Sequence, residues 1–359
     1  MTFFLDWSMT IDDTASKLEA FSSPERHVYL ETRRTPVQAA KKNTSRLSVA
    51  RIAEAAKLID PVFLNSPQFQ SETLGEQIGA EIVLKVETIN PIRSFKGRGA
   101  DFLLHHLPRS NRTLVCASAG NFGQGLAYAA RKHGHKLVVF AAENANPLKL
   151  RRMRHFGADV RLSGSDFDAA KQRARKFSEE SNAQFIEDGR EPAISEGAGT
   201  IGLELCRWSR RFDFVIVPLG NGALLSGIGT WIKAHSPSTK VIAVCAAGAP
   251  SMAISLREHM PLSTESTETI ADGIAVRIPV PEALDDLALI VDEVLLVDDD
   301  AMLAAMRLIF QQHGLVIEPA GIAGLAATIT YKEKFRGAHI ATPLCGGNLT
   351  PEQIHKWLA

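Results

Sequence analysis

One stretch of the chain reads Asn90-Pro91-Ile92-Arg93-Ser94-Phe95-Lys96-Gly97-Arg98-Gly99. An apolar run from Glu81 to Glu87 precedes it and predicts a strand, and a helical pattern from Ala100 to Leu107 follows it. The glycines favour a tight turn between the two elements. Lys96 can therefore point from a strand-to-helix junction into a cleft, where its amine can form a Schiff base with an aldehyde or ketone. For any single lysine a solvated loop position is the common alternative.

The composition is that of an ordinary globular chain. The 359 residues suffice for two domains or one large one, and the hydrophobic and charged fractions are 45% and 22%. The formal net charge of +0 gives no general attraction to nucleic acid or to an anionic membrane. The four cysteines form no CxxC pair, and the N-terminus lacks the basic segment of a signal peptide. We therefore expect a cytoplasmic protein without nucleic-acid, membrane or metal partners.

From Glu81 onward, short apolar runs alternate with helical patterns. The predicted strands cover residues 81–87, 113–117, 136–141, 159–162, 212–217, 240–244, 289–297 and 339–342. They are rich in Val, Ile and Leu, which is typical of strands buried on both faces of a parallel sheet. The pattern predicts an α/β protein with two open parallel sheets. Residues 1–75 are weakly patterned, and we expect an N-terminal extension packed on the body.

Three further turns follow predicted strands. They read Ser118-Ala119-Gly120-Asn121, Pro218-Leu219-Gly220-Asn221-Gly222-Ala223-Leu224 and Cys345-Gly346-Gly347-Asn348. In parallel α/β proteins such turns meet at the carboxyl edge of a sheet, where ligands bind. The amides that begin the helix after Asn121 can hold a carboxylate, and those after Gly222 can hold a phosphate. Tight packing is the alternative for each turn taken singly.

The glycine patterns do not support the common nucleotide sites. Neither cluster reads GxGxxG, and the chain has no GxxxxGK[ST]. A lysine, a phosphate cradle and a carboxylate cradle remain, and these are the parts that a pyridoxal-phosphate enzyme needs. The basic residues of the stretch 151–154 are expected on a solvated face.

The stretch from Ser94 to Ala100 resembles the S-F-K-x-R-G-A signature of the serine/threonine dehydratases, in the fold type II group of pyridoxal-phosphate enzymes. Five further segments resemble that family's motifs in the same order; they cover residues 118–121, 220–224, 269–273, 318–321 and 345–348. The resemblance implies two open α/β domains similar to the tryptophan synthase β chain. It implies a small domain of residues 109–189, a large cofactor-binding domain of residues 76–108 and 190–359, and a homodimer.

The resemblance also implies roles for single residues. Lys96 would hold pyridoxal 5'-phosphate and then remove the substrate α-proton, beside Phe95. The cofactor phosphate would bind at Gly220, Asn221, Gly222, Ala223 and Leu224. Asn121 would bind the ring 3-hydroxyl, Glu318 would lie near the ring, and Cys345 would face the pyridine nitrogen. The substrate carboxylate would bind at Ser118, Ala119, Gly120 and Asn121.

Three residue choices bear on the reaction. A neutral thiol at Cys345 makes a weaker electron sink than a carboxylate and favours prompt loss of a β-substituent over transamination. Ala119 cannot exchange a proton, whereas serine racemases of this group carry a serine there. Cys245 to Ser251 contains no carboxylate for a divalent cation. We therefore expect β-elimination from a β-hydroxy amino acid such as L-threonine or L-serine, giving a 2-oxo acid and ammonia.

Several alternatives stay open. The motifs bind the amino-acid head, so another 3-hydroxy or β-substituted amino acid could be the substrate. A β-replacement of the cysteine synthase type ranks second, because those enzymes usually carry T-S-G-N-T where this chain has Ser118-Ala119-Gly120-Asn121-Phe122. A catalytically inactive binding protein on the same scaffold is the third alternative.

Overall fold

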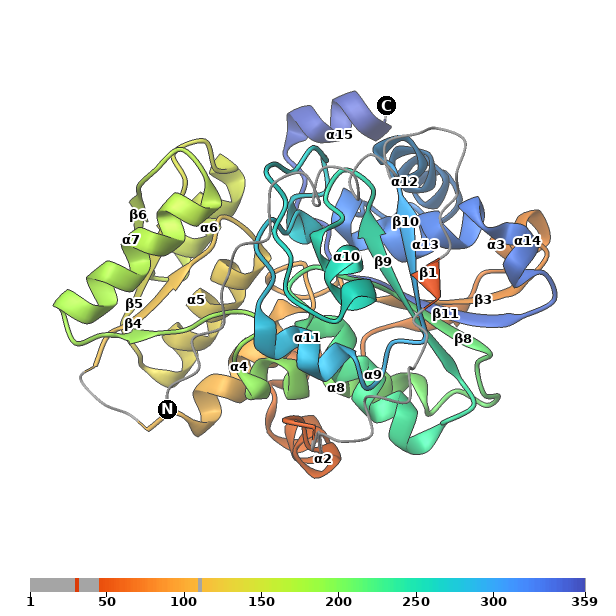
Figure 1. Cartoon of the computed structure of the whole chain (residues 1–359), viewed down its shortest axis with the longest axis horizontal. Helices are drawn as coiled ribbons and strands as arrows, with labels where there is room; N and C mark the ends of the chain where they lie inside the picture. The colour runs from red at the N-terminus through yellow and green to blue at the C-terminus, as the bar shows by residue number, and fades with distance from the viewer. Residues whose placement is uncertain (1–29, 32–44, 109–111, 359) are drawn as a thin grey trace, which may run out of the picture.

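A computed structural model describes residues 30–31, 45–108 and 112–358 of the chain. Figure 1 shows two sheets side by side, each accompanied by helices. The prediction of an N-terminal extension falls largely outside the described residues. The described parts of that stretch, residues 30–31 and 45–75, contain helices and two short strands.

The larger sheet has seven strands in the order β1-β10-β9-β8-β11-β3-β2. Their bounds are β1 Leu30–Glu31, β2 Gln68–Gln70, β3 Glu81–Val86, β8 Phe214–Pro218, β9 Lys240–Ala246, β10 Glu293–Val297 and β11 His339–Leu344. The five inner strands run parallel, as predicted, with Ile340 opposite both Ile82 and Phe214. The edge strands β1 and β2 are antiparallel to their neighbours.

The smaller sheet has four parallel strands in the order β6-β5-β4-β7. Its strands are β4 Leu114–Ala117, β5 Leu137–Ala141, β6 Asp159–Leu162 and β7 Gln184–Phe185. The intervening helices are α5 Asn121–His133, α6 Pro147–His155 and α7 Phe167–Glu180. In Figure 1 this unit occupies the left of the molecule.

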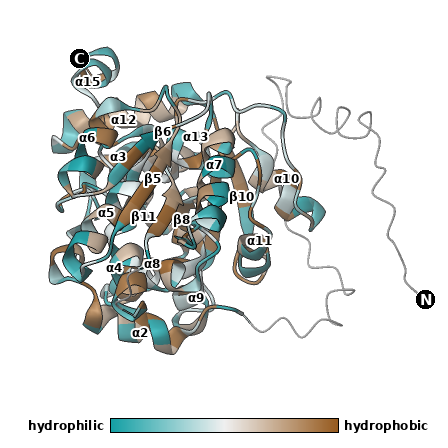
Figure 2. Cartoon of the chain, turned by 90° about the vertical axis from the view of Figure 1, so that its left-hand side faces the viewer, coloured by the Kyte–Doolittle hydropathy of each residue, from teal (hydrophilic) through white to brown (hydrophobic). Residues whose placement is uncertain are grey.

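The remaining helices surround the larger sheet. They are α2 Val49–Leu58, η2 Pro61–Phe63, α3 Glu72–Ile78, α4 Lys96–His106, α8 Pro192–Leu205, α9 Ala223–His235, α10 Ser251–Glu258, η3 Asp272–Ile274, α11 Pro281–Leu287, α12 Asp299–His313, α13 Pro319–Thr330, α14 Lys332–Phe335 and α15 Pro351–Leu358. Figure 2 shows apolar strands in the interior and hydrophilic segments on the outer helices.

Alternate residues of the large sheet enter two separate cores. In β8, Ile216 packs in a core with residues of α12 and α13, whereas Val215 and Val217 pack in a core with residues of α8 and α9. Both faces of the sheet are therefore buried, which explains why its strands read as continuous apolar runs.

Helix α8 packs closely against both α4 and α9. A side-chain carbon at Gly99 of α4 would collide with the carbonyl oxygen of Ile194 in α8, and one at Gly227 of α9 would collide with that of Ser195. Glycine is required at these positions because any larger residue would force the helices apart. Since α4 begins at Lys96 and α9 begins at Ala223, helix α8 sets the spacing between them.

The predicted elements differ from the structure mainly at their ends. The helix predicted from Ala100 begins at Lys96, so this lysine is its first residue rather than part of the preceding turn. The strand predicted over 289–297 begins at Glu293, because Leu289 and Ile290 form a backbone-bonded turn after α11. The helix predicted over 320–335 breaks at Tyr331, whose hydroxyl donates to the carbonyl of Leu296 at 2.8 Å.

Candidate active site

Lys96 lies at the start of α4, on a turn fastened to the end of β11. Ser94 forms an isolated antiparallel bridge with Gly346, and the amide of Phe95 donates to the carbonyl of Cys345 at 3.1 Å. The Lys96 ammonium lies 4.8 Å from the ring centre of Phe95 and 5.8 Å from that of Phe122. Two of the four predicted turns are therefore joined, with the lysine amine between aromatic rings.

The amine of Lys96 forms an ion pair that the sequence did not suggest. Its Nζ lies 2.5 Å from Oδ2 of Asp188, which follows strand β7. The Lys96 and Asp188 side chains are 15% and 11% exposed, so the pair is mostly shielded from water. The other carboxylate oxygen of Asp188, Oδ1, is buried and has no hydrogen-bond partner among the described residues.

The second turn forms the amino end of α5. The hydroxyl oxygen of Ser118 accepts hydrogen bonds from the amides of Gly120 and Gly123, at 3.2 and 2.9 Å. Gly120 caps the helix in an extended conformation, and a side-chain carbon there would meet no atom within 4 Å. Space is thus left in front of the helix terminus, where backbone amides and the helix dipole favour an anion. Ala119 lies in the same turn and carries no proton-exchanging group.

Asn121 belongs to a buried group of amide and carboxylate side chains. Its Nδ2 donates to Oε1 of Glu318, and its Oδ1 accepts from Nδ2 of Asn348 at 2.8 Å. The backbone amide of Asn348 donates to Oε2 of Glu318 at 3.2 Å. The second turn, the start of α13 and the fourth turn therefore meet at one place.

Two basic residues of α6 approach this group. Lys149 Nζ lies 2.7 Å from Asp272 Oδ2 and 3.7 Å from Glu318 Oε2. Arg152 donates to Oδ1 of Asn348. Burial raises the pKa of the Glu318 carboxyl, and the charge of Lys149 opposes that rise. The expectation of a solvated face for the stretch 151–154 is wrong for Arg152, which is half-buried because it faces this site.

The third turn forms the amino end of α9. Gly222 adopts a left-handed conformation with φ of +95°, which glycine accommodates without strain. A side-chain carbon at Gly220 would lie 2.6 Å from the carbonyl oxygen of Gly273, so the backbone is closely packed there. Asn221 is half-buried in the turn, while Ala223 and Leu224 begin the helix and are buried.

Cys345 remains a neutral thiol in this setting. It is buried, and its Sγ donates to the carbonyl of Pro343 at 3.3 Å. Burial raises the pKa of the thiol well above its ordinary value, and the carboxylates of Glu87 and Glu318 raise it further.

The site fits pyridoxal phosphate. Ser226, one turn into α9, has a buried hydroxyl without a hydrogen-bond partner among the described residues, and it lies beside Gly222. The Oε1 of Gln124 in α5 is also buried without a hydrogen-bond partner among the described residues. Buried polar atoms normally find partners, so these two atoms, near the amino ends of α5 and α9, fit the binding of a polar ligand at those helix ends. An amine for the aldehyde and a helix terminus for the phosphate complete the set.

The chain belongs to the pyridoxal-phosphate dependent enzyme family, whose model matches residues 59–346. The chain is 34% identical over 312 residues to the L-threonine ammonia-lyase of Thermotoga maritima, covering 86% of this chain and 78% of that one. It is 32% identical to the biosynthetic L-threonine dehydratase of Pasteurella multocida over 77% of this chain and 55% of the relative. The structure of the processed form of threonine deaminase isoform 2 from Solanum lycopersicum superposes with a TM-score of 0.79 and 28% identity, covering 87% of this chain and 94% of that chain.

These comparisons confirm the predicted family, the α/β fold of the fold type II group and the cofactor, pyridoxal phosphate. Sequence reasoning did not place Asp188, Lys149 or Arg152 at the site. Asp188 follows a strand of only two residues, which is too short to read from a pattern. Lys149 and Arg152 lie on a helix whose many basic residues suggested a solvent-facing element.

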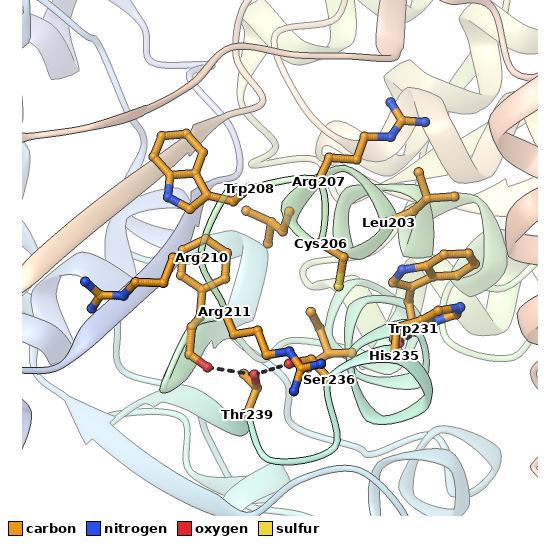
Figure 3. Close-up of a pocket in the computed structure, with 13 residues that line it drawn as sticks. Leu203, Cys206, Arg207, Trp208, Arg210, Arg211, Trp231, His235, Ser236 and Thr239 are labelled. Carbon is orange, nitrogen blue, oxygen red and sulfur yellow. Dashed lines mark hydrogen bonds between the residues drawn. The ribbon is translucent and has the colours of Figure 1, made fainter.

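A separate cavity of about 440 Å³ lies between the carboxyl ends of α8 and α9. Figure 3 shows Cys206 and Trp231 on one side of it and Arg211 extending toward Ser236. Its lining contains none of the predicted site residues.

Within residues 30–31, 45–108 and 112–358, no helix is long and apolar enough to cross a membrane, and no cluster of three or more acidic, histidine or cysteine side chains could hold a metal.

Proposed function

We propose that the chain is an ammonia-lyase that removes water from L-threonine or L-serine and releases a 2-oxo acid and ammonia. The observation that carries the proposal is the placement of Lys96 Nζ at the amino end of α4, paired with Asp188 and flanked by aromatic rings. The family and the printed activities of the relatives support the same reaction.

The cofactor would be held by three groups of residues. The backbone of Gly220, Asn221, Gly222, Ala223 and Leu224 would bind the phosphate at the positive end of α9. Asn121 would bind the ring hydroxyl and Cys345 would face the pyridine nitrogen as a neutral donor. Phe95 and Glu318 would lie beside the ring. When bound, pyridoxal phosphate supplies an electron sink for the α-carbon.

The protein would supply binding and proton transfer. Ser118, Ala119, Gly120 and Asn121 would hold the substrate carboxylate in the open space before α5. Lys96 Nζ would remove the α-proton as a general base. With alanine at position 119, no proton donor would stand there on the other side of the α-carbon, which supports elimination over racemisation.

We also propose the finer organisation of the enzyme. The chain would divide into a small domain of residues 109–189 and a large domain of residues 76–108 and 190–359, which the two separate sheets support. A cytoplasmic location is supported by the four unpaired cysteines. A homodimer, a small-molecule substrate as the only partner class and the absence of a metal rest on the resemblance and the composition.

The test is a substrate screen on the protein loaded with pyridoxal phosphate. We expect 2-oxobutanoate from L-threonine and pyruvate from L-serine, together with the visible absorbance band of a lysine-bound cofactor. Lys96→Ala should lose the band and the activity, whereas Lys57→Ala, on the exposed face of α2, should keep both. A wild-type protein that shows neither band nor 2-oxo acid with any β-hydroxy amino acid would contradict the proposal.

A further inference from the structure

The carboxylate of Asp188 makes no ion pair with the structure around it apart from the one with Lys96, among the described residues. Its neighbour Glu187 binds Lys171, Arg175 and Arg190 of the surrounding structure. The carboxylate of Asp188 is paired with Lys96 alone among the described residues, and its Oδ1 is buried without a hydrogen-bond partner there. An acceptor of this kind is costly unless a donor reaches it.

The backbone holds Asp188 firmly in place. Gly189 adopts a left-handed conformation with φ of +84°, and a side-chain carbon there would collide with the carbonyl oxygen of Asn221 in the third turn. Arg46 donates to the carbonyl of Arg190 at 2.9 Å. The segment from Asp188 to Arg190 therefore packs tightly against the proposed phosphate turn. This packing holds the Asp188 carboxylate beside Lys96.

The position of Asp188 relative to a substrate follows from the role of Lys96. A base must come within hydrogen-bond reach of the α-proton that it removes. Asp188 Oδ2 lies 2.5 Å from the same Nζ, so it is within reach of a group on the adjacent β-carbon. The substrate carboxylate would lie elsewhere, at the amino end of α5.

We propose that Asp188 determines specificity by accepting a hydrogen bond from the substituent on the substrate's β-carbon. The site would then select substituents that carry a hydrogen-bond donor, such as a hydroxyl, and disfavour those without one. This inference rests on the proposed function and names the substrate class of the same site.

The elimination of water balances with Lys96 as the only group that takes up and gives back a proton. Lys96 Nζ takes the α-proton, the Cα–H electron pair forms the Cα=Cβ bond, and the Cβ–O bond breaks with its pair on oxygen. The proton on Lys96 then passes to that oxygen, which leaves as water. Asp188 keeps the ammonium and the departing oxygen in one hydrogen-bonded group, and the step requires no oxidant or reductant.

The kinetic test compares two leaving groups in Asp188→Ala. We expect kcat/KM for L-serine to fall by about 10- to 100-fold, the worth of a hydrogen bond to a charged group. For β-chloro-L-alanine, whose chloride donates no hydrogen bond, the fall should stay within about threefold. Asp188→Asn, which keeps an acceptor oxygen, should lie between wild type and Asp188→Ala, and Asp285→Ala on an exposed position is the matched control.

A binding test separates this inference from the proposed function because it needs no turnover. α-Methyl-L-serine and 2-aminoisobutyrate lack an α-proton and differ by the hydroxyl, and both perturb the absorbance of the bound cofactor. Wild type should prefer α-methyl-L-serine by about 10-fold or more, and Asp188→Ala should lose this preference while keeping the cofactor band. An unchanged preference, or equal losses with L-serine and β-chloro-L-alanine, would assign Asp188 to positioning Lys96 only and overturn the inference.

Discussion

Lys149 Nζ lies 2.7 Å from Asp272 Oδ2, and this ion pair joins helix α6 of the four-stranded unit to the 3-10 turn η3 of the seven-stranded unit. The Lys149 side chain is 4% exposed, whereas that of Asp272 is 57% exposed. Lys149 also faces the buried carboxylate of Glu318. The cation therefore neutralises two carboxylates at the edge of the candidate site. Removing Lys149 and removing Asp272 should consequently have unequal effects.

Replacing Lys149 should be the more damaging change. Lys149→Met leaves Glu318 buried without its cation, which typically costs about 3 kcal/mol of stability. We expect a clear loss of unfolding free energy in urea and weaker cofactor binding by absorbance titration. Asp272→Asn should cause a much smaller change, because Lys149 keeps Glu318 and the lost carboxylate is solvated. Equal effects of the two substitutions would contradict this assignment.

Arg98 is fully buried between two carboxylates. Its guanidinium lies 2.8 Å from Glu87 and 2.6 Å from Glu204. Arg98→Met removes the ion-pair partner of buried Glu87 and leaves Glu204 with Lys85 alone, and we expect a loss of about 3–5 kcal/mol in urea unfolding. Arg210→Ala breaks the exposed pair with Glu81 and should cost at most about 1 kcal/mol. A small loss in Arg98→Met would show that the buried charges find other partners.

The same network predicts a dependence of stability on acid. Burial alone raises the pKa of the Glu204 carboxyl, but the hydrogen bonds and charge of Arg98 and Lys85 outweigh it and lower the pKa below its ordinary value of 4.5. A carboxyl whose pKa is lower in the folded than in the unfolded protein stabilises the fold at pH values above its unfolded pKa. This stabilisation is lost as the pH falls through the pKa of the folded state. The urea midpoint should therefore fall as the pH is lowered through 4.5 and below.

The control for this pH dependence is Glu204→Gln. The variant is less stable at neutral pH, yet its midpoint should fall less steeply with acid because the titrating group is gone. A slope identical to that of wild type would assign the acid sensitivity to other carboxyls.

Replacement by alanine should affect different properties at two glycines of the site. Gly120→Ala meets no atom within 4 Å, so folding and cofactor binding should be unchanged while KM for the amino acid rises, since the methyl group occupies the proposed carboxylate space. Gly220→Ala would press against the carbonyl of Gly273, displace the third turn and weaken cofactor affinity. An unaltered KM in Gly120→Ala would argue against a carboxylate at that helix terminus.

One thiol should react in the native protein. Cys206 is exposed, whereas Cys116, Cys245 and Cys345 are buried, and burial raises the pKa of Cys245 to about 12. A thiol reagent should label one cysteine quickly and all four after denaturation. Cys206→Ser should abolish the rapid phase, and rapid labelling of that variant would disprove the predicted accessibility.

The sequence predicted what is periodic and local. The parallel strands could be predicted because burial on both faces leaves runs of Val, Ile and Leu. Lys96 and Asn121 could be predicted because both follow such strands in glycine-containing turns. The short edge strands β1 and β2 escaped prediction because two or three residues form no pattern. Asp188 and Lys149 depend on which elements meet in space, and no local pattern records that.

Helix α8 supplies none of the predicted cofactor or substrate contacts, yet the backbone contacts at Gly99 and Gly227 fix α4 and α9 against it. The distance between the lysine amine and the proposed phosphate turn consequently depends on a helix to which no predicted ligand contact is assigned. Larger residues at Gly197 or Gly199 of α8 would press on the backbones of α4 and α9 and lengthen that distance, although neither glycine belongs to a predicted binding turn.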